Sequence, residues 1–321
     1  GEKNRIGMDS LLYKDWQKDL FNPEYSFVTD TNVYFLTLAP ESINKRYTLT
    51  QPDYTNINLT PFAYYLHEEK VIYDNTFFKN VANDIRYSYF EPSEGFGGPI
   101  TANSSLTFNV SNMYINGPAP SLHCRIGNNN QLAKIEIRFN NQLLDTKNNG
   151  AKNTLQLYYP LEYSQLSNGN NILNLKNTGG NTDRHRVSVA SLIYARTLDF
   201  QNRNTFFFTM PADNSPRLLD ISAFKSDKQD VFVYDTKSNI KYWTSVTDNQ
   251  VRVLLNPIQS NTRYFITNSA AIKKVSDISV FIPQTFTDEG TQYLIITNRS
   301  LRNNGTDYVQ AYADYRNSTQ G

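Results

Sequence analysis

Apolar and polar residues alternate along short segments of the first 200 residues, and such segments recur about every ten residues. Alternation with a period of two is typical of strands that bury one face and expose the other. Many short strands at this spacing indicate a β-sandwich or jelly roll. The segments are Asn32–Leu38, Arg86–Phe90, Ser105–Val110, Leu132–Phe139, Thr154–Tyr159, Ile172–Lys176 and Arg186–Ala195.

Leu132–Phe139 shows the clearest alternation. Its apolar residues Ile135, Ile137 and Phe139 share one face, and its charged residues share the other. The pair Asn140-Asn141 follows directly, and asparagine tolerates the left-handed backbone of a tight hairpin turn. This part of the chain therefore predicts a half-buried strand and a hairpin.

From about Gln201 the apolar residues run more continuously, which predicts a second group of better-covered strands. We expect residues 1–200 to form a jelly-roll-like β-sandwich and residues 201–284 a smaller immunoglobulin-like sandwich. The expected strands of the second group are Phe206–Thr209, Val231–Tyr234, Ile240–Trp243, Val251–Leu255, Tyr264–Thr267 and Ile278–Ile282.

Residues 285–321 have a different pattern. Tyr293–Thr297 is an unbroken apolar run, typical of a strand covered on both faces. Tyr308, Ala311, Tyr312 and Tyr315 then recur at helical spacing. A single strand and helix cannot close a sheet. We therefore expect this unit to open a truncated α/β domain, the alternative being a strand and helix that dock on the preceding sandwich.

Composition agrees with a mainly β chain and excludes several function classes. The sequence holds 39 asparagines, 22 tyrosines and 19 phenylalanines, which favour turns and strands. The net charge of +1 gives no concentrated basic surface for nucleic acid, and no apolar run is long enough for a membrane helix. One cysteine and three scattered histidines predict neither an internal disulfide nor a zinc site.

His123-Cys124 is the only place where a thiol and an imidazole are close in sequence. The run lies in a strand pattern, so the two side chains are expected on opposite faces. A cysteine nucleophile and its base must instead come within hydrogen-bond reach. We expect Cys124 to be a buried structural residue that reacts with thiol reagents only after unfolding.

The other charged clusters are interpreted as solvated loops. The run His67-Glu68-Glu69 lacks a second histidine at helical spacing and is expected in a turn. The basic run Asp183–Arg186 is too short for a nucleic-acid surface, and the carboxylates Glu91 and Glu94 lie in a Gly/Pro-rich loop. Phosphate-binding, dinucleotide and serine-hydrolase motifs are absent from the sequence. We therefore assign no catalytic, cofactor-binding or metal-binding residue and no cofactor.

Aromatic residues leave a sugar-binding platform open as an alternative to core packing. Trp16, Trp243 and the tyrosines could stack on sugar rings, although aromatic residues of alternating strands pack in cores first.

Phrases near both ends of the chain resemble a known family. The first set is Asp9–Tyr13, Asn22–Ser26, Thr29–Thr31, Tyr34–Thr37, Lys45-Arg46 and the turn Glu94–Gly98; the second is Tyr293–Thr297 and Ala311–Arg316. They are similar to the region before the peptidase domain, and to the opening of that domain, in gingipain-type cysteine peptidases of the type IX secretion system. These are the PorU-like C-terminal signal peptidases of Bacteroidetes. The closing glutamate of the family's aromatic turn phrase is absent here.

The resemblance implies a non-catalytic N-terminal β region of a larger secreted or surface peptidase. In the family the catalytic His and Cys lie downstream of the opening strand, so neither His123 nor Cys124 matches them. The implied partners are the chain's own downstream peptidase domain, secretion-system proteins or surface glycans, without nucleic acid or a membrane span. The implied location is the periplasm, the outer-membrane surface or the outside of the cell. The competing class is a free-standing adhesion or carbohydrate-binding β-sandwich module.

Overall fold

A computed structural model describes residues 20–25, 34–35, 46–78, 93–128, 133–150, 153–282, 295–298, 301–302 and 305–318. The chain divides into two compact units, residues 1–273 and residues 274–321. The mainly β fold expected from the sequence is confirmed, with sandwich-like sheets and a C-terminal helix. The expected strands Asn32–Leu38 and Arg86–Phe90 lie outside the described residues, apart from Tyr34 and Phe35.

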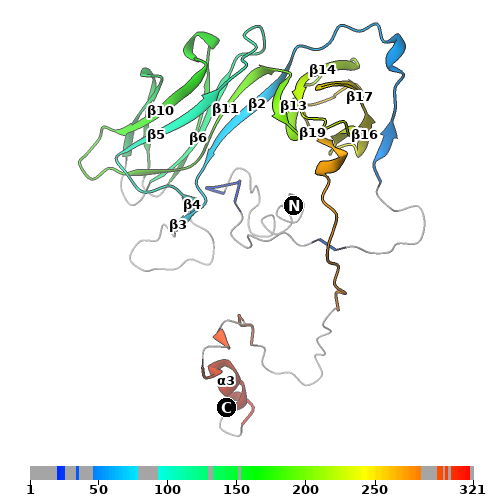
Figure 1. Ribbon diagram of the computed structural model, residues 1–321. Helices are drawn as coiled ribbons and strands as arrows, with labels where there is room; N and C mark the ends of the chain where they lie inside the picture. Colours follow the sequence, from blue (N-terminus) through cyan, green and yellow to red (C-terminus); the bar gives the residue numbers. More distant parts are fainter. Residues whose placement is uncertain are drawn as a thin grey trace. The chain divides into compact units, whose positions relative to one another are not determined.

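A nine-stranded sheet is the longest sheet of the described residues of the first unit (Figure 1). Its strands in spatial order are β1 (Thr48–Thr50), β16 (Ile240–Trp243), β15 (Val231–Asp235), β19 (Thr262–Asn268), β13 (Thr205–Met210), β2 (Tyr64–Ile72), β11 (His185–Thr197), β6 (Ser121–Asn128) and β9 (Thr154–Pro160). The pairing is antiparallel except at β1, which runs parallel to β16. The sheet therefore joins strands from all parts of the first unit.

Two smaller sheets and a short ribbon complete the first unit. One four-stranded sheet contains β5 (Asn103–Val110), β10 (Gly169–Asn177), β7 (Ala133–Phe139) and β8 (Gln142–Asn149). The other contains β12 (Asp199–Arg203), β14 (Arg217–Phe224), β18 (Gln250–Leu255) and β17 (Ser245–Thr247), and β3 (Thr76–Phe78) pairs with β4 (Gly95–Gly97). In the second unit, α3 covers Tyr308–Arg316, which confirms the helical spacing of its tyrosines.

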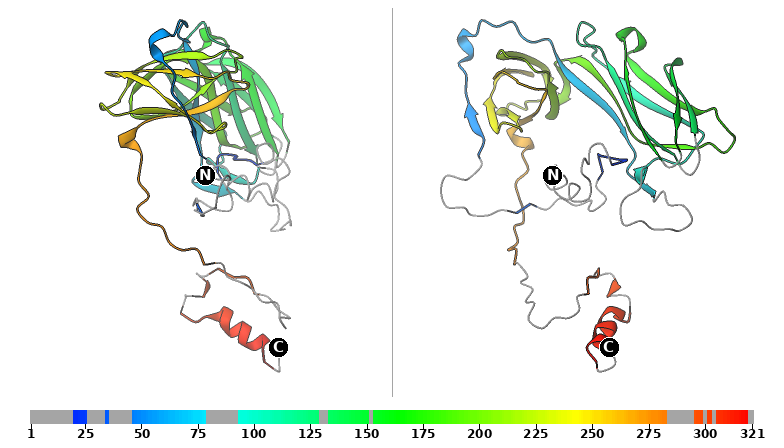
Figure 2. Two further views of the ribbon diagram at one scale, coloured as in Figure 1. Left: turned by 90° about the vertical axis from the view of Figure 1, so that its right-hand side faces the viewer. Right: turned by 180° about the vertical axis from the view of Figure 1, so that it is seen from behind.

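Each four-stranded sheet covers one part of the long sheet, so the first unit contains two sandwiches with a shared sheet (Figures 1 and 2). The first core holds apolar residues of β5, β6, β7, β9, β10 and β11, and the second holds residues of β13 to β16, β18 and β19. β2 serves both, because Tyr65 lies in the second core and Val71 packs against the first. The boundaries proposed at residues 200 and 284 stay predictions.

The predicted hairpin after β7 is confirmed. Asn140 and Asn141 have φ angles of 47° and 67°, the left-handed conformation that asparagine tolerates. Ile135, Ile137 and Phe139 are buried in the first core, as the alternation of this strand predicts.

The strand expected at Ile278–Ile282 is wrong. The structure describes these residues outside any strand, and the side chains of Ile278, Val280, Phe281 and Ile282 are exposed. The strand expected at Tyr293–Thr297 lies partly outside the described residues. The described part, from Ile295, is not a strand, and Ile296 is 87% exposed.

Candidate functional site

A hollow opens where β2 and β13 separate. The two strands share one residue pair, Leu66 with Thr209, although each is fully paired on its other edge. Beyond that pair the facing edges enclose a hollow of about 620 Å³. We call this hollow the wedge. It is lined by Glu24, Leu66, His67, Glu68, Glu69, Lys70, Arg203, Thr205, Phe206, Phe207, Phe208, Thr209, Arg263 and Phe265.

Ion pairs occupy the β2 side of the wedge. Lys70 Nζ lies 2.8 Å from Glu24 Oε1 and 3.2 Å from Glu68 Oε2, and these partners raise the pKa of Lys70 against the opposing effect of burial. His67 Nε2 lies 3.2 Å from Glu69 Oε2. This side therefore carries three carboxylates and one permanent cation.

Aromatic rings and guanidinium groups form the opposite side. The rings of Phe207 and Phe265 lie 4.6 Å apart, with the Arg263 guanidinium 4.3 Å from the Phe207 ring. Arg203 lies 4.8 Å from the Phe206 ring. The wedge thus combines exposed apolar surface with charges of both signs, which suits binding, and it holds no cysteine or serine nucleophile among its lining residues.

The expectation that His67-Glu68-Glu69 is a solvated turn is wrong. All three residues lie within β2, the strand on which both cores meet. Their charges concealed the strand, because strands are depleted in glutamate. On the face that carries Tyr65 and Val71, the two positions between them are polar. The signal that could have found it is the run of aromatic and β-branched residues on either side.

The expectation that Asp183–Arg186 is a charged loop holds for Asp183 and Arg184 and is wrong for the other two residues. β11 begins at His185, and the side chains of His185 and Arg186 are fully buried. His185 Nε2 lies 2.9 Å from Ser104 Oγ, and its Nδ1 lies 3.0 Å from Asn177 Oδ1. Burial lowers the pKa of His185 to about 4.

Arg186 is the centre of a junction between distant segments. Its guanidinium lies 5.1 Å from the Phe21 ring and 4.2 Å from the Phe78 ring, and it donates to the carbonyl of Ser93. The Phe21 ring in turn fits between Gly97 and Gly127, where an added Cβ would approach ring atoms to 2.9 Å. Glycine is therefore needed at both positions for close contact.

His123 and Cys124 project from opposite faces of β6, as their spacing predicts. Cys124 is buried in the first core, and burial raises the pKa of its thiol. His123 is half-buried, and its ring contacts the Tyr158 ring at 4.8 Å. The expected burial of Cys124 is confirmed. Such a thiol is poorly suited to nucleophilic attack, because the reactive thiolate is disfavoured.

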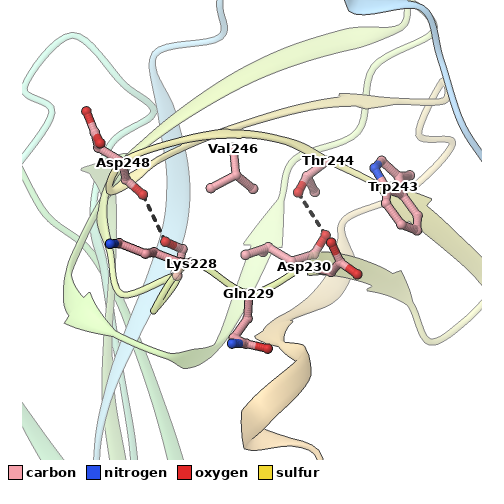
Figure 3. Close-up of a pocket in the computed structure, with 9 residues that line it drawn as sticks. Lys228, Gln229, Asp230, Trp243, Thr244, Val246 and Asp248 are labelled. Atoms are coloured by element: carbon pink, nitrogen blue, oxygen red, sulfur yellow. Dashed lines mark hydrogen bonds between the residues drawn. The ribbon is translucent and has the colours of Figure 1, made fainter.

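A second hollow, of about 410 Å³, lies beside Trp243 in the second sandwich (Figure 3). Lys228, Gln229, Asp230 and Asp248 also line it. Hydrogen bonds from Thr244 Oγ1 to the Val231 carbonyl and from Ser226 Oγ to the Asp248 carbonyl, at 2.8 and 2.9 Å, hold its walls together (Figure 3). The Trp243 indole thus lies in the same hollow as the Gln229 amide and the carboxylates of Asp230 and Asp248.

The remaining predictions concern Trp16, Glu91, metal ligands and membrane helices. Trp16 and Glu91 lie outside the described residues. Across the parts of the chain that the structure covers, no three His, Cys, Asp or Glu side chains gather as metal ligands. Among the same residues, no helix has the length and apolar character to cross a membrane.

Comparisons with known proteins give similarities of structure only. No protein-family model and no curated protein matches the chain. The chain is similar to dimeric latent PorU from Porphyromonas gingivalis, with 9% identity and a TM-score of 0.49 over 66% of this chain and 21% of the PorU chain. This chain therefore spans about a fifth of the PorU length.

Carbohydrate-binding modules are also similar to part of the chain. A family 36 module of a multidomain xylanase from the hindgut metagenome of Trinervitermes trinervoides has 14% identity and a TM-score of 0.24, over 40% of this chain and 95% of the module. A family 35 module from Clostridium thermocellum has 13% identity and a TM-score of 0.22, over 42% of this chain and 98% of the module.

Proposed function

We propose that the chain is the non-catalytic β region of a gingipain-type cysteine peptidase linked to type IX secretion. In this role it supports the peptidase domain or contacts substrate or secretion partners, in the periplasm, at the outer-membrane surface or outside the cell. The chemistry of its single thiol agrees with a supporting role, since Cys124 is buried and its neighbour His123 lies on the other face of β6.

The observation that carries the proposal is the meeting of two phrases of the family resemblance. Asn22 Nδ2 donates to the Phe96 carbonyl at 3.3 Å and to the Tyr73 carbonyl at 2.8 Å. The rings of Tyr25 and Phe96 lie 4.9 Å apart in an edge-to-face arrangement. Residues from the two phrases, more than 70 positions apart, thus form one packed unit. A shared structural role is a better account of the likeness than coincidence of short phrases.

The C-terminal phrase supports the same proposal through the exposed tyrosines of its helix. Ala311–Arg316 lies within α3, whose residues Tyr308, Tyr312 and Tyr315 are all exposed. A helix of nine residues is marginal in water unless its apolar side packs against other elements. We infer that this tyrosine stripe packs against further elements of a peptidase domain.

The test compares residues 1–321 with the native gene product, using hydrolysis of a fluorogenic peptide library. We expect hydrolysis by the native product and none by residues 1–321, with or without Cys124→Ala. Residues 1–321 should also bind a separately produced downstream domain, and the variant Tyr308→Ala/Tyr312→Ala/Tyr315→Ala should weaken that binding. Tyr158→Ala, an exposed tyrosine of β9, is the matched control. Hydrolysis by residues 1–321 that Cys124→Ala abolishes, or a native gene without a downstream peptidase domain, would refute the proposal.

A carbohydrate-binding module is the second candidate, favoured by the hollow beside Trp243. An aromatic side chain next to hydrogen-bonding amide and carboxylate groups is an arrangement that suits a sugar ring. Affinity electrophoresis in gels containing xylan, mannan or dextran tests it. Retardation that Trp243→Ala abolishes and Tyr158→Ala leaves unchanged would favour this function, and equal mobility in all gels would exclude it for these glycans.

A further inference from the structure

We propose that the wedge binds an extended peptide segment with basic side chains, which adds as a strand alongside β2. This inference goes beyond the proposed function, because it concerns a binding site within the β region itself. It rests on the backbone edges of the wedge, on the side chains that border them and on the distribution of charge.

The backbone edges are the first support. β2 pairs with β11 along all of Tyr64–Ile72, and β13 pairs with β19 along all of Thr205–Met210. On their facing edges these two described strands share the single pair Leu66 with Thr209. Backbone groups of alternate residues on each edge therefore point into the wedge, where another main chain can pair with them.

The register defines which side chains an added strand would meet. Antiparallel continuation from Leu66 and Thr209 places Glu68 opposite Phe207 on the outward face. Phe207 is 48% exposed, and its contact with Phe265 holds it as an apolar platform. On the inward face, Glu69 continues opposite Phe206. An added strand would thus lie between carboxylates on β2 and aromatic rings on β13. This holds on the outward face and on the inward face of the sheet.

The charge of β2 selects the occupant. Glu24 and Glu68 share the single cation Lys70, and Glu69 has the imidazole of His67 as its partner. The β2 side therefore keeps an excess of negative charge at neutral pH. The cations of the opposite side, Arg203 and Arg263, keep their charge over the phenylalanine rings, so only the positions that face β2 favour a cation. A strand with lysine or arginine fits beside β2, whereas an acidic strand is repelled by it.

The probe for the test is a fluorescein-labelled heptapeptide that alternates lysine with valine or threonine. Two related peptides serve as comparisons, one with glutamate in place of lysine and one with N-methyl groups on alternate amides. Fluorescence anisotropy at low ionic strength measures binding to the full chain. We expect the lysine peptide to bind at least about tenfold more tightly than either comparison peptide, because it alone has both the charge and the backbone donors.

Variants of the wedge test the assignment of the site. Phe207→Ala should weaken binding of the lysine peptide about tenfold. Glu68→Lys should reverse the preference in favour of the glutamate peptide. The controls are Tyr158→Ala, on the outward face of β9, and Glu136→Lys, a strand carboxylate that pairs with Arg138 as Glu68 pairs with Lys70. Far-UV circular dichroism and the urea midpoint of each variant report that it is folded.

Three results would overturn the proposal. They are equal binding of the lysine and glutamate peptides, equal binding of the N-methylated peptide, and an unchanged preference in the folded Glu68→Lys variant. The second result would indicate surface charge attraction without strand pairing. Slower amide hydrogen exchange at residues 67–70 in the presence of the lysine peptide is the expected independent sign of an added strand.

Discussion

Replacing Arg186 with alanine is expected to lower the free energy of unfolding of the first sandwich by about 3 kcal/mol. The side chain is only 2% exposed, so its removal leaves a cavity beside the rings of Phe21 and Phe78. It also leaves the carbonyl of Ser93 without the donated hydrogen bond of the guanidinium. Urea unfolding followed by circular dichroism measures the change.

Two further variants separate packing from charge. Arg186→Met keeps much of the side-chain volume and should recover part of the loss, because a buried charge is costly to desolvate. That cost is visible in the pKa of Arg186, which burial lowers to about 10. Arg138→Ala removes a surface arginine paired with Glu136 and should cost less than about 1 kcal/mol. If Arg186→Ala unfolds at the wild-type urea concentration, the junction does not stabilise the sandwich.

Acidification from pH 7 to about pH 4 is expected to destabilise the first sandwich by about 3 kcal/mol through His185 alone. Burial lowers the pKa of His185 from 6.5 to about 4 in the folded protein. Between these values the unfolded chain binds a proton that the folded protein does not, so stability falls as the pH falls. Below about pH 4 both states bind the proton, and the loss of stability caused by this residue is complete.

Burial keeps His185 neutral in the folded protein, and its two hydrogen bonds fit the neutral ring. Asn177 Oδ1 can only accept, so Nδ1 donates to it over 3.0 Å, and Nε2 accepts from the Ser104 hydroxyl over 2.9 Å. A proton on Nε2 would remove the acceptor of the hydrogen bond that the Ser104 hydroxyl donates. His185→Gln should reduce the slope of unfolding free energy against pH between about pH 4 and pH 6.5, while His123→Gln should leave most of it. Equal slopes in wild type and His185→Gln would contradict this prediction.

Local patterns were sufficient for the strands whose side chains follow the period of the sheet. β7 and its Asn140-Asn141 turn were predicted because alternation and left-handed asparagines are properties of neighbouring residues. The burial of Cys124 was predicted from the general tendency of a free cysteine on a strand to be buried. In contrast, Ile278–Ile282 is as apolar as a buried strand, but the structure describes it outside any strand. An apolar run indicates that a segment can bury its side chains. To form a strand, the segment must also pair with the edge of a neighbouring strand.

The candidate site could not be predicted from the sequence, because distant segments build it. The sequence predicts a solvated turn at residues 67–69, yet these residues border the wedge formed with β13, about 140 positions away. The sequence alone determined a mainly β chain, its half-buried strands and the position of α3. Only the tertiary structure decided that two sandwiches share one sheet and that His185 and Arg186 are buried. The reason is physical: a charged side chain can be buried when other segments supply its partners, and Phe21, Ser93 and Ser104 reach these two residues only through the fold.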